Sequence, residues 1–105
     1  MARFEYAQSA IDDLDMILGY TAGEWGVAKA EKYLNGLEKQ AQLLAEMPTL
    51  GKIYPPYKEQ KLRVFPFEKH LIYYLETDYG VTLLHLTHNR MDQLRHLSNI
   101  GNDNL

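Results

Sequence analysis

Three cationic or ionisable side chains are the strongest candidates for a functional surface: Arg63, His88 and Arg90. Arg63 lies in residues 52–70, a basic strip that holds five Lys or Arg residues and two Glu residues. His88 and Arg90 belong to the stretch His88-Asn89-Arg90-Met91-Asp92, where a strand pattern gives way to a helical one. Such side chains bind phosphates or partner carboxylates through charge-assisted hydrogen bonds. They also occur on solvated surfaces, so the residue types alone leave both interpretations open.

The four histidines do not form a local metal-binding motif. His85 and His88 are three residues apart on an expected strand, so they point to opposite faces of the sheet. Asp92 and His96 are four residues apart on an expected helix, but two ligands do not make a metal site. Solvated or capping histidines are the simpler interpretation, and we expect neither a metal nor another cofactor.

Residues for covalent catalysis are also missing. The chain has no cysteine, which excludes disulfides and thiol chemistry. Its two serines are Ser9, which with Asp12 predicts the start of a helix, and Ser98, which lies near the end of the sequence. Neither serine has the flanking glycines of a nucleophile elbow. The glycines between positions 19 and 26 fit no phosphate-binding loop. We therefore expect no catalytic residue in this chain.

Length and charge limit the function classes further. The chain has 105 residues, 46% apolar and 24% charged, which is typical of one globular domain. A net charge of -3 argues against a general nucleic-acid binder, although residues 1–48 carry -4 and residues 49–105 carry +1. No apolar run approaches the roughly 20 residues that span a bilayer, and no secretory signal is visible. We expect no membrane partner and a cytoplasmic location.

Hydrophobic spacing predicts the elements that position the candidate residues. The alternation of Phe4 and Tyr6 indicates a short opening strand. One helix should begin at the Ser9 cap and stop between Gly19 and Gly23, and a second should run from about Trp25 to Met47, ended by Pro48. Strands are expected at 61–65, 70–75 and 81–88, followed by a short helix at 91–97.

This order, β-α-α-β-β-β-(α), predicts an α+β fold in which an N-terminal helical hairpin packs on a mainly antiparallel sheet, with a short C-terminal helix. We expect one domain over residues 1–98 and a flexible tail over residues 99–105. Of the adjacent Tyr73 and Tyr74, one should face the helices and the other should face away.

Several segments together resemble a known family. They are Ala10-Ile11-Asp12-Asp13-Leu14, Trp25-Gly26, Leu44-Ala45-Glu46-Met47-Pro48-Thr49-Leu50-Gly51, Lys61-Leu62-Arg63, His70-Leu71-Ile72-Tyr73-Tyr74 and Leu86-Thr87-His88-Asn89-Arg90-Met91-Asp92. In their order and spacing over residues 3–97 they resemble the ParE-like toxins of type II toxin–antitoxin modules, within the RelE/ParE group.

The resemblance implies a toxin that a cognate antitoxin neutralises in a hetero-oligomer. The ParE-like branch further implies binding to DNA gyrase with its cleaved DNA, with Arg63, His88 and Arg90 on the contact surface. Arg63 matches the central-strand arginine of the group. The strand 81–86 carries no arginine, the terminal segment lacks a catalytic Tyr or His, and the net charge is negative. These departures favour the ParE-like branch over the RelE-like ribosome-dependent mRNA endonucleases.

Two alternatives stay open at the level of sequence. The first is an mRNA endonuclease that uses Arg63 with Lys58, Lys61 or His88. The second is a non-toxic interaction partner of an antitoxin. In either case the antitoxin is expected to cover a groove over the helical hairpin and the sheet edge.

Overall fold

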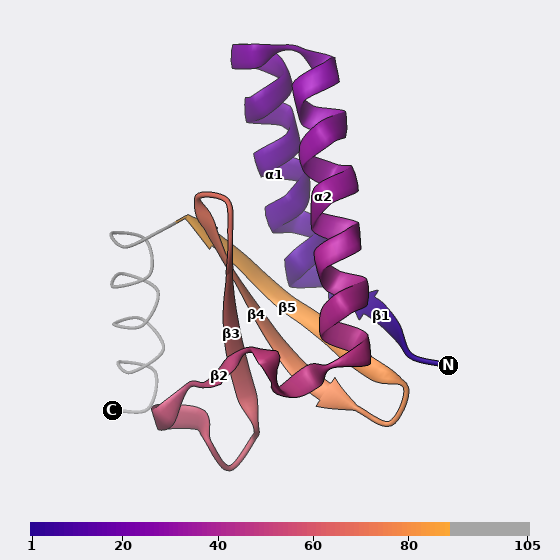
Figure 1. Ribbon diagram of the computed structural model, residues 1–105. Helices are drawn as coiled ribbons and strands as arrows, with labels where there is room; N and C mark the ends of the chain where they lie inside the picture. The colour runs from indigo at the N-terminus through magenta and orange to yellow at the C-terminus, as the bar shows by residue number, and fades with distance from the viewer. Residues whose placement is uncertain (89–105) are drawn as a thin grey trace.

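Two long helices pack against one face of a five-stranded sheet in the computed structural model, which describes residues 1–88 (Figure 1). In chain order the elements are β1 (Arg3–Tyr6), α1 (Gln8–Trp25), α2 (Val27–Glu46), η1 (Pro48–Leu50), β2 (Lys52–Ile53), η2 (Pro55–Tyr57), β3 (Leu62–Phe67), β4 (His70–Thr77) and β5 (Gly80–His88). The strand order is β1-β5-β4-β3-β2, with β1 parallel to β5 and every other pair antiparallel. The predicted α+β fold is confirmed. The predicted helix at 91–97 and the tail at 99–105 lie outside the described residues.

The core lies between the helical hairpin and the sheet. Small side chains on α2, Ala41 and Ala45, allow this helix to approach the strands closely, and they are almost completely buried. Tyr74 faces the helices and is 0% exposed, whereas Tyr73 projects from the other face of the sheet, where its ring meets that of Tyr54. The remaining buried residues of the core are Ala10, Leu14, Leu37, Leu44, Ile72, Val81, Leu83 and Leu86.

The start of α1 differs from the sequence prediction. The helix begins at Gln8, its N-cap residue is Ala7, and no side chain caps it, so the predicted Ser9 cap is wrong. The Ser9 hydroxyl instead donates a 2.6 Å hydrogen bond to the carbonyl oxygen of Leu84 in β5. The physical reason is that β1 ends at Tyr6, so the outer edge of β5 needs other partners beyond that point.

Ala7 and residues of α1 supply those partners. The Ala7 amide donates to the Leu83 carbonyl at 2.9 Å, which continues the β1–β5 ladder by one residue. One carboxylate oxygen of Asp13 accepts the Leu86 amide at 3.0 Å and contacts His85 Nδ1 at 3.0 Å. A bulge at Leu84 lets both Leu83 and Leu86 face the helices. The helix thereby covers a strand edge that would otherwise be open.

The connection between the helices is shorter than predicted. Helix α1 continues through Gly19 and Gly23 to Trp25, so the predicted stop between the two glycines is wrong. A helical glycine costs only about 1 kcal/mol relative to alanine, and packing against α2 offsets that cost. Gly26 alone joins the helices, with a φ of 97° that favours glycine. Trp25 therefore ends α1 and is 67% exposed, outside the buried stripe of α2.

The end of the hairpin where α1 joins α2 projects beyond the sheet (Figure 1). Within the described part of the chain, neither helix is long and apolar enough to cross a membrane.

Candidate functional site

Arg63 lies on β3, directly opposite Tyr74 of β4. Its Nη1 atom donates a 2.7 Å hydrogen bond to the carbonyl oxygen of Gly51. The Tyr74 hydroxyl accepts the Gly51 amide at 2.8 Å and donates to the Pro48 carbonyl at 2.7 Å. A Cβ atom at residue 51 would overlap the Tyr74 ring and hydroxyl, so only glycine fits. Arg63 and Tyr74 together hold the turn between α2 and β2.

His88 lies at the opposite end of the sheet. It ends β5, directly across from His70 of β4, and the two imidazole centroids are 5.3 Å apart in an edge-to-face arrangement. Arg63 pairs with Tyr74 of β4, and His88 pairs with His70 of the same strand. These two partners are four residues apart, which is roughly 13 Å along the strand at about 3.3 Å per residue. The structure therefore does not bring Arg63 and His88 together. Arg90, the third predicted site residue, lies outside the described residues.

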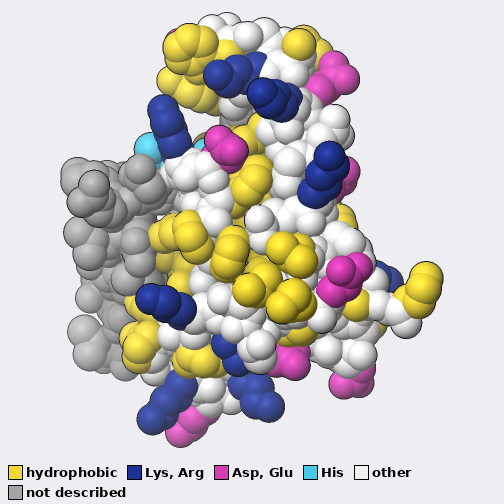
Figure 2. All heavy atoms as spheres, viewed as in Figure 1, with side chains coloured by type: hydrophobic (Ala, Val, Ile, Leu, Met, Phe, Trp, Pro, Cys, Tyr) yellow, Lys and Arg dark blue, Asp and Glu magenta, His cyan; other side chains and the backbone are white. Residues whose placement is uncertain are grey.

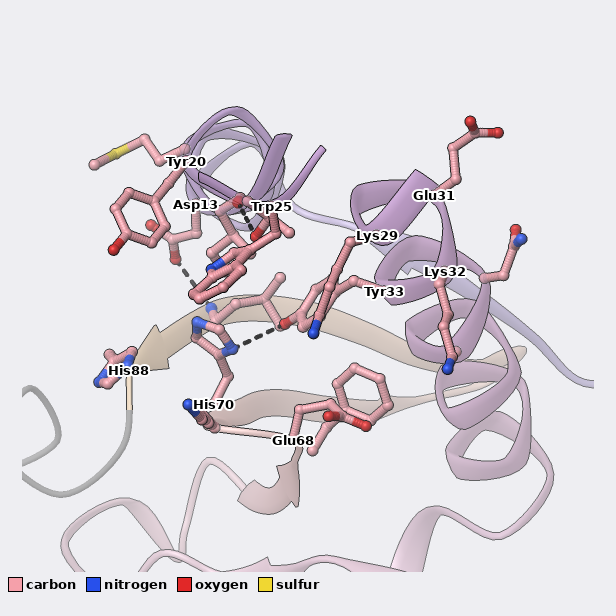
Figure 3. A pocket seen from close by; sticks show the side chains of 18 of the residues that line it. Asp13, Tyr20, Trp25, Lys29, Glu31, Lys32, Tyr33, Glu68, His70 and His88 are labelled. Carbon is pink, nitrogen blue, oxygen red and sulfur yellow. Dashed lines mark hydrogen bonds between the residues drawn. The ribbon is translucent and has the colours of Figure 1, made fainter. Parts of the chain in front are cut away.

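A large groove lies beside His88, beneath the projecting half of the hairpin. Its volume is about 1570 Å³. Helices α1 and α2 form its roof, and the β3–β4 turn and the end of β5 form its floor (Figure 3). The chain thus builds a concave surface from three segments that are far apart in sequence.

Aromatic and thioether side chains line the roof of the groove. Met16, Tyr20 and Trp25 are 75%, 68% and 67% exposed. The Trp25 ring lies above His70, and the Lys29 ammonium is 5.6 Å from its centroid, within reach of a cation–π contact (Figure 3). Large apolar side chains that are left in water in one place are typical of a surface that binds a partner.

Charge in the groove is mixed, with an excess of cations. Four lysines line it, Lys29, Lys32, Lys39 and Lys69, against Asp13, Glu31 and Glu68. Lys29 and Lys32 extend from α2 toward the groove, whereas the Glu31 carboxylate points away from it (Figure 3). The groove therefore offers apolar surface bordered by lysines, which suits a ligand that combines apolar and acidic groups.

Tyr33 and His70 meet on the floor of the groove. The Tyr33 hydroxyl and His70 Nδ1 share a 3.1 Å hydrogen bond, and the Tyr33 ring also packs edge-on against Phe67. Burial, followed by the charge of Glu68, raises the pKa of Tyr33 far above its usual value. The tyrosine therefore stays neutral near pH 7 and acts as a hydrogen-bonding group rather than a base.

The exposed apolar side chains and the lysines of the groove suit it to binding a partner. Among residues 1–88, no group of three or more His, Asp or Glu side chains is placed to hold a metal ion.

A comparison with protein families identifies the family of the chain. A family model described as the ParE toxin of type II toxin-antitoxin system, parDE, matches residues 4–93. The chain belongs to the ParE toxin family.

A solved structure has a similar fold. It is described as the chromosomal ParDE TA system from P. aeruginosa and superposes with a TM-score of 0.69, covering 86% of this chain and 98% of that one. The sequences are 18% identical, so this likeness concerns the fold alone. No curated protein sequence matches the chain.

Sequence reasoning missed most of the groove of this ParE chain. The sequence places Trp25 at the expected start of the second helix and His70 in an expected strand, and neither is among the predicted site residues. A usable signal was present, because Trp25 is followed by Lys29 and Lys32 at helical spacing and precedes Gly26, a residue that favours a helix connection. The hairpin reaches beyond the sheet because α1 continues to Trp25, whereas Gly19 and Gly23 predict an earlier end of this helix.

Proposed function

We propose that this chain is the toxin of a type II module, that it inhibits DNA gyrase by stabilising the cleaved-DNA complex, and that a cognate antitoxin neutralises it. The observation that carries the proposal is the groove beneath the hairpin, with Met16, Tyr20 and Trp25 exposed in its roof and four lysines against three carboxylates along its lining, in a chain of the ParE family. Action on gyrase implies a cytoplasmic location.

The antitoxin would bind in this groove. A helix or extended segment with apolar anchors would cover the exposed aromatic rings, and flanking acidic residues would pair with the lysines. A second apolar surface lies where the C-terminal half of α2 meets β2 and β3 (Figure 2). Its exposed members include Leu43, Met47 and Leu50, at 41%, 52% and 39%. An antitoxin that wraps from the groove onto this surface would cover both.

The toxin would act on gyrase through binding energy alone. A ligand shifts an equilibrium only by the difference between its affinities for the two states. Driving a cleaved complex from 1:99 to 99:1 requires about 10⁴-fold preference for the cleaved state. The strand-breaking chemistry would remain that of gyrase, and this chain would not act as an enzyme.

His88 and Arg90 are the proposed target contacts. His88 stands at the open end of β5, beside the groove, and Arg90 follows two residues later. Arg63 would contribute differently from the sequence expectation, because its guanidinium already holds the Gly51 carbonyl. We propose that it positions the α2–β2 turn.

A supercoiling and cleavage assay tests this proposal. Purified gyrase, relaxed plasmid and ATP are titrated with the chain, and inhibited supercoiling with accumulating linear DNA is the expected result. His88→Ala and Arg90→Ala should reduce that effect, and Arg3→Ala, which removes an exposed cation opposite Gly80, at the end of β5 far from His88, should not. Folded chain that leaves gyrase unaffected would contradict the proposal.

Two further experiments test the alternative functions. New RNA ends on translated mRNA, detected by primer extension, would indicate a RelE-like endonuclease. Unhindered growth when the chain is produced alone would indicate a non-toxic antitoxin partner.

A further inference from the structure

Three exposed lysines lie on the segment that leads from β2 into β3. Lys52 belongs to β2, and Lys58 and Lys61 lie in the loop that follows it. Figure 2 shows Lys and Arg side chains gathered at the lower end of the molecule, where Figure 1 places this segment. Every ion pair within residues 1–88 lies elsewhere, so no described carboxylate, not even Glu59 of the same loop, neutralises the three lysines. The segment is therefore a positive patch on a chain with a net charge of -3.

Lys61 has a backbone conformation that lysine rarely adopts. Its φ is 59°, and its amide donates a 3.0 Å hydrogen bond to the Lys58 carbonyl, which closes a turn between the two lysines. Left-handed backbone suits glycine and asparagine better, because the Cβ atom of other residues crowds the carbonyl oxygen that follows it. The turn also holds two lysine Cα atoms within about 7 Å of one another. Both features oppose folding, and such strain is typical of functional sites.

Aromatic rings fix the loop against the sheet. The rings of Tyr54 and Tyr57 stack with their centroids 5.8 Å apart, and the Tyr54 ring meets Tyr73, which is 2% exposed, edge-on at 6.3 Å. The Tyr54 amide donates to the Leu62 carbonyl at 2.8 Å, which continues the β2–β3 ladder. The loop is thus preorganised, and it loses less conformational entropy on binding than a flexible loop would.

The composition of this segment favours a polyanion over a protein surface. Its large hydrophobic side chains, Ile53, Tyr54 and Tyr57, are at least partly buried, and none is among the exposed ones. Protein interfaces are centred on apolar side chains, whereas DNA is bound through cations that displace counterions from its phosphates. The segment offers cations without an apolar centre, unlike the groove, so the two surfaces suit different partners.

We propose that Lys52, Lys58 and Lys61 bind the phosphate backbone of duplex DNA, and that this DNA is the segment held by gyrase in the cleaved complex. The assignment to the DNA of gyrase rests on the proposed function, whereas binding to free DNA is measured without gyrase. Phosphate contacts carry no sequence information, so no sequence preference is expected.

The position of the segment separates the DNA contact from the proposed gyrase contact. Leu62, at the end of the loop, pairs with Leu75 of β4, and His88 pairs with His70 of the same strand. These partners are five residues apart, roughly 16 Å at about 3.3 Å per residue. A toxin that contacts protein and DNA at two separate points would prefer the complex that presents both, because the second contact forms at a high effective concentration.

The salt dependence of DNA binding tests the inference. A fluorescently labelled duplex of about 20 base pairs is titrated with the full chain at several salt concentrations, and binding is followed by anisotropy. The logarithm of the association constant should fall against the logarithm of salt concentration with a slope of about -2.7, or -0.9 for each of three phosphates. Lys52→Gln and Lys58→Gln should each change the slope to about -1.8. Arg3→Gln, which removes a cation at the other edge of the sheet, is the matched control and should leave it unchanged.

Lys61→Gly separates binding from folding. Glycine accepts the φ of 59° without strain, so the midpoint of thermal unfolding should not fall. The slope should nevertheless change to about -1.8, and the potency in the gyrase cleavage assay should drop about two- to fivefold, the range of exposed ion pairs. Lys61→Arg, which keeps the charge, should retain both. A lower midpoint for Lys61→Gly would mark the lysine as structural and would contradict its assignment.

Two results would overturn the inference outright. They are a wild-type slope near zero and equal slopes for Lys61→Gly and the wild type. Polyglutamate that binds as tightly as DNA would assign the patch to an acidic protein and overturn it as well. Equal poisoning of gyrase by Lys61→Gly and the wild type would refute the contact with gyrase-held DNA and leave the proposed function intact. A wild-type chain that shows the expected slopes but leaves gyrase unaffected would contradict the proposed function and support the DNA contact alone.

Discussion

Replacement of Tyr74 by phenylalanine removes one oxygen atom and two hydrogen bonds from the turn after α2. The hydroxyl accepts the Gly51 amide at 2.8 Å and donates to the Pro48 carbonyl at 2.7 Å, and the tyrosine is 0% exposed. Each buried main-chain group that loses its partner costs about 1–3 kcal/mol. We therefore expect the free energy of unfolding to fall by roughly 2–4 kcal/mol, because water at the turn recovers part of the loss.

Urea denaturation measures this change, and thermal unfolding should show a midpoint roughly 8–32 °C lower, at about 4–8 °C per kcal/mol for a domain near this size. Tyr20→Phe is the matched control, since that side chain is 68% exposed and should change stability by less than about 0.5 kcal/mol. Arg63→Ala should be coupled to Tyr74→Phe by about 0.5–3 kcal/mol, because both side chains hold Gly51. Equal stability of Tyr74→Phe and Tyr20→Phe, or strict additivity with Arg63→Ala, would refute the reasoning.

Four further predictions follow from single contacts. Asp13→Ala should lower the unfolding free energy in urea by about 1–2 kcal/mol, because the Leu86 amide loses its acceptor, and wild-type stability would contradict this. Stability should fall as pH rises from about 10 toward 12, because the pKa of folded Tyr6 is raised to about 12 while the unfolded residue loses its proton near 10. Tyr6→Phe should make that fall less steep, and the contribution of Tyr33, whose pKa is also raised, should remain. Trp25→Ala should weaken antitoxin binding about 10–30-fold by titration calorimetry with no loss of thermal stability. His88→Ala should reduce growth inhibition while the melting temperature and antitoxin affinity stay near wild type, and a lower melting temperature would mark it as structural.

Much of the fold was predictable because the residue patterns of the helices and strands agree with the proline and glycine residues that end them. Pro48 ends α2 as predicted, one residue after its C-cap Met47. The strand-forming residues of 70–75 and 81–88, with Gly80 between them at a φ of 144°, produce the hairpin of β4 and β5. Tyr73 and Tyr74 project from opposite faces, as expected of neighbours on a strand.

The failures have a common physical cause. Ser9 carries the signature of a helix cap, but it serves the edge of a strand 75 residues away. Gly19 and Gly23 have a low helix propensity, but tertiary packing outweighs it. Arg63 has the charge of a target contact, yet its guanidinium bonds to Gly51, which precedes it in the chain. In each case the deciding partner lies in another element of the fold, and a local pattern does not identify it.

The pairing of β1 with β5 also determines when the groove can exist during synthesis. Arg3 pairs with Gly80, so the first strand waits for the last described strand to leave the ribosome. The floor of the groove includes His88, at the far end of that same strand, and its roof begins at Asp13. Contacts between such distant positions form late because the intervening chain must first be closed into a loop. A nascent chain that stops short of β5 would therefore lack one wall of the binding surface, and the surface would be assembled only once nearly the whole domain had been translated.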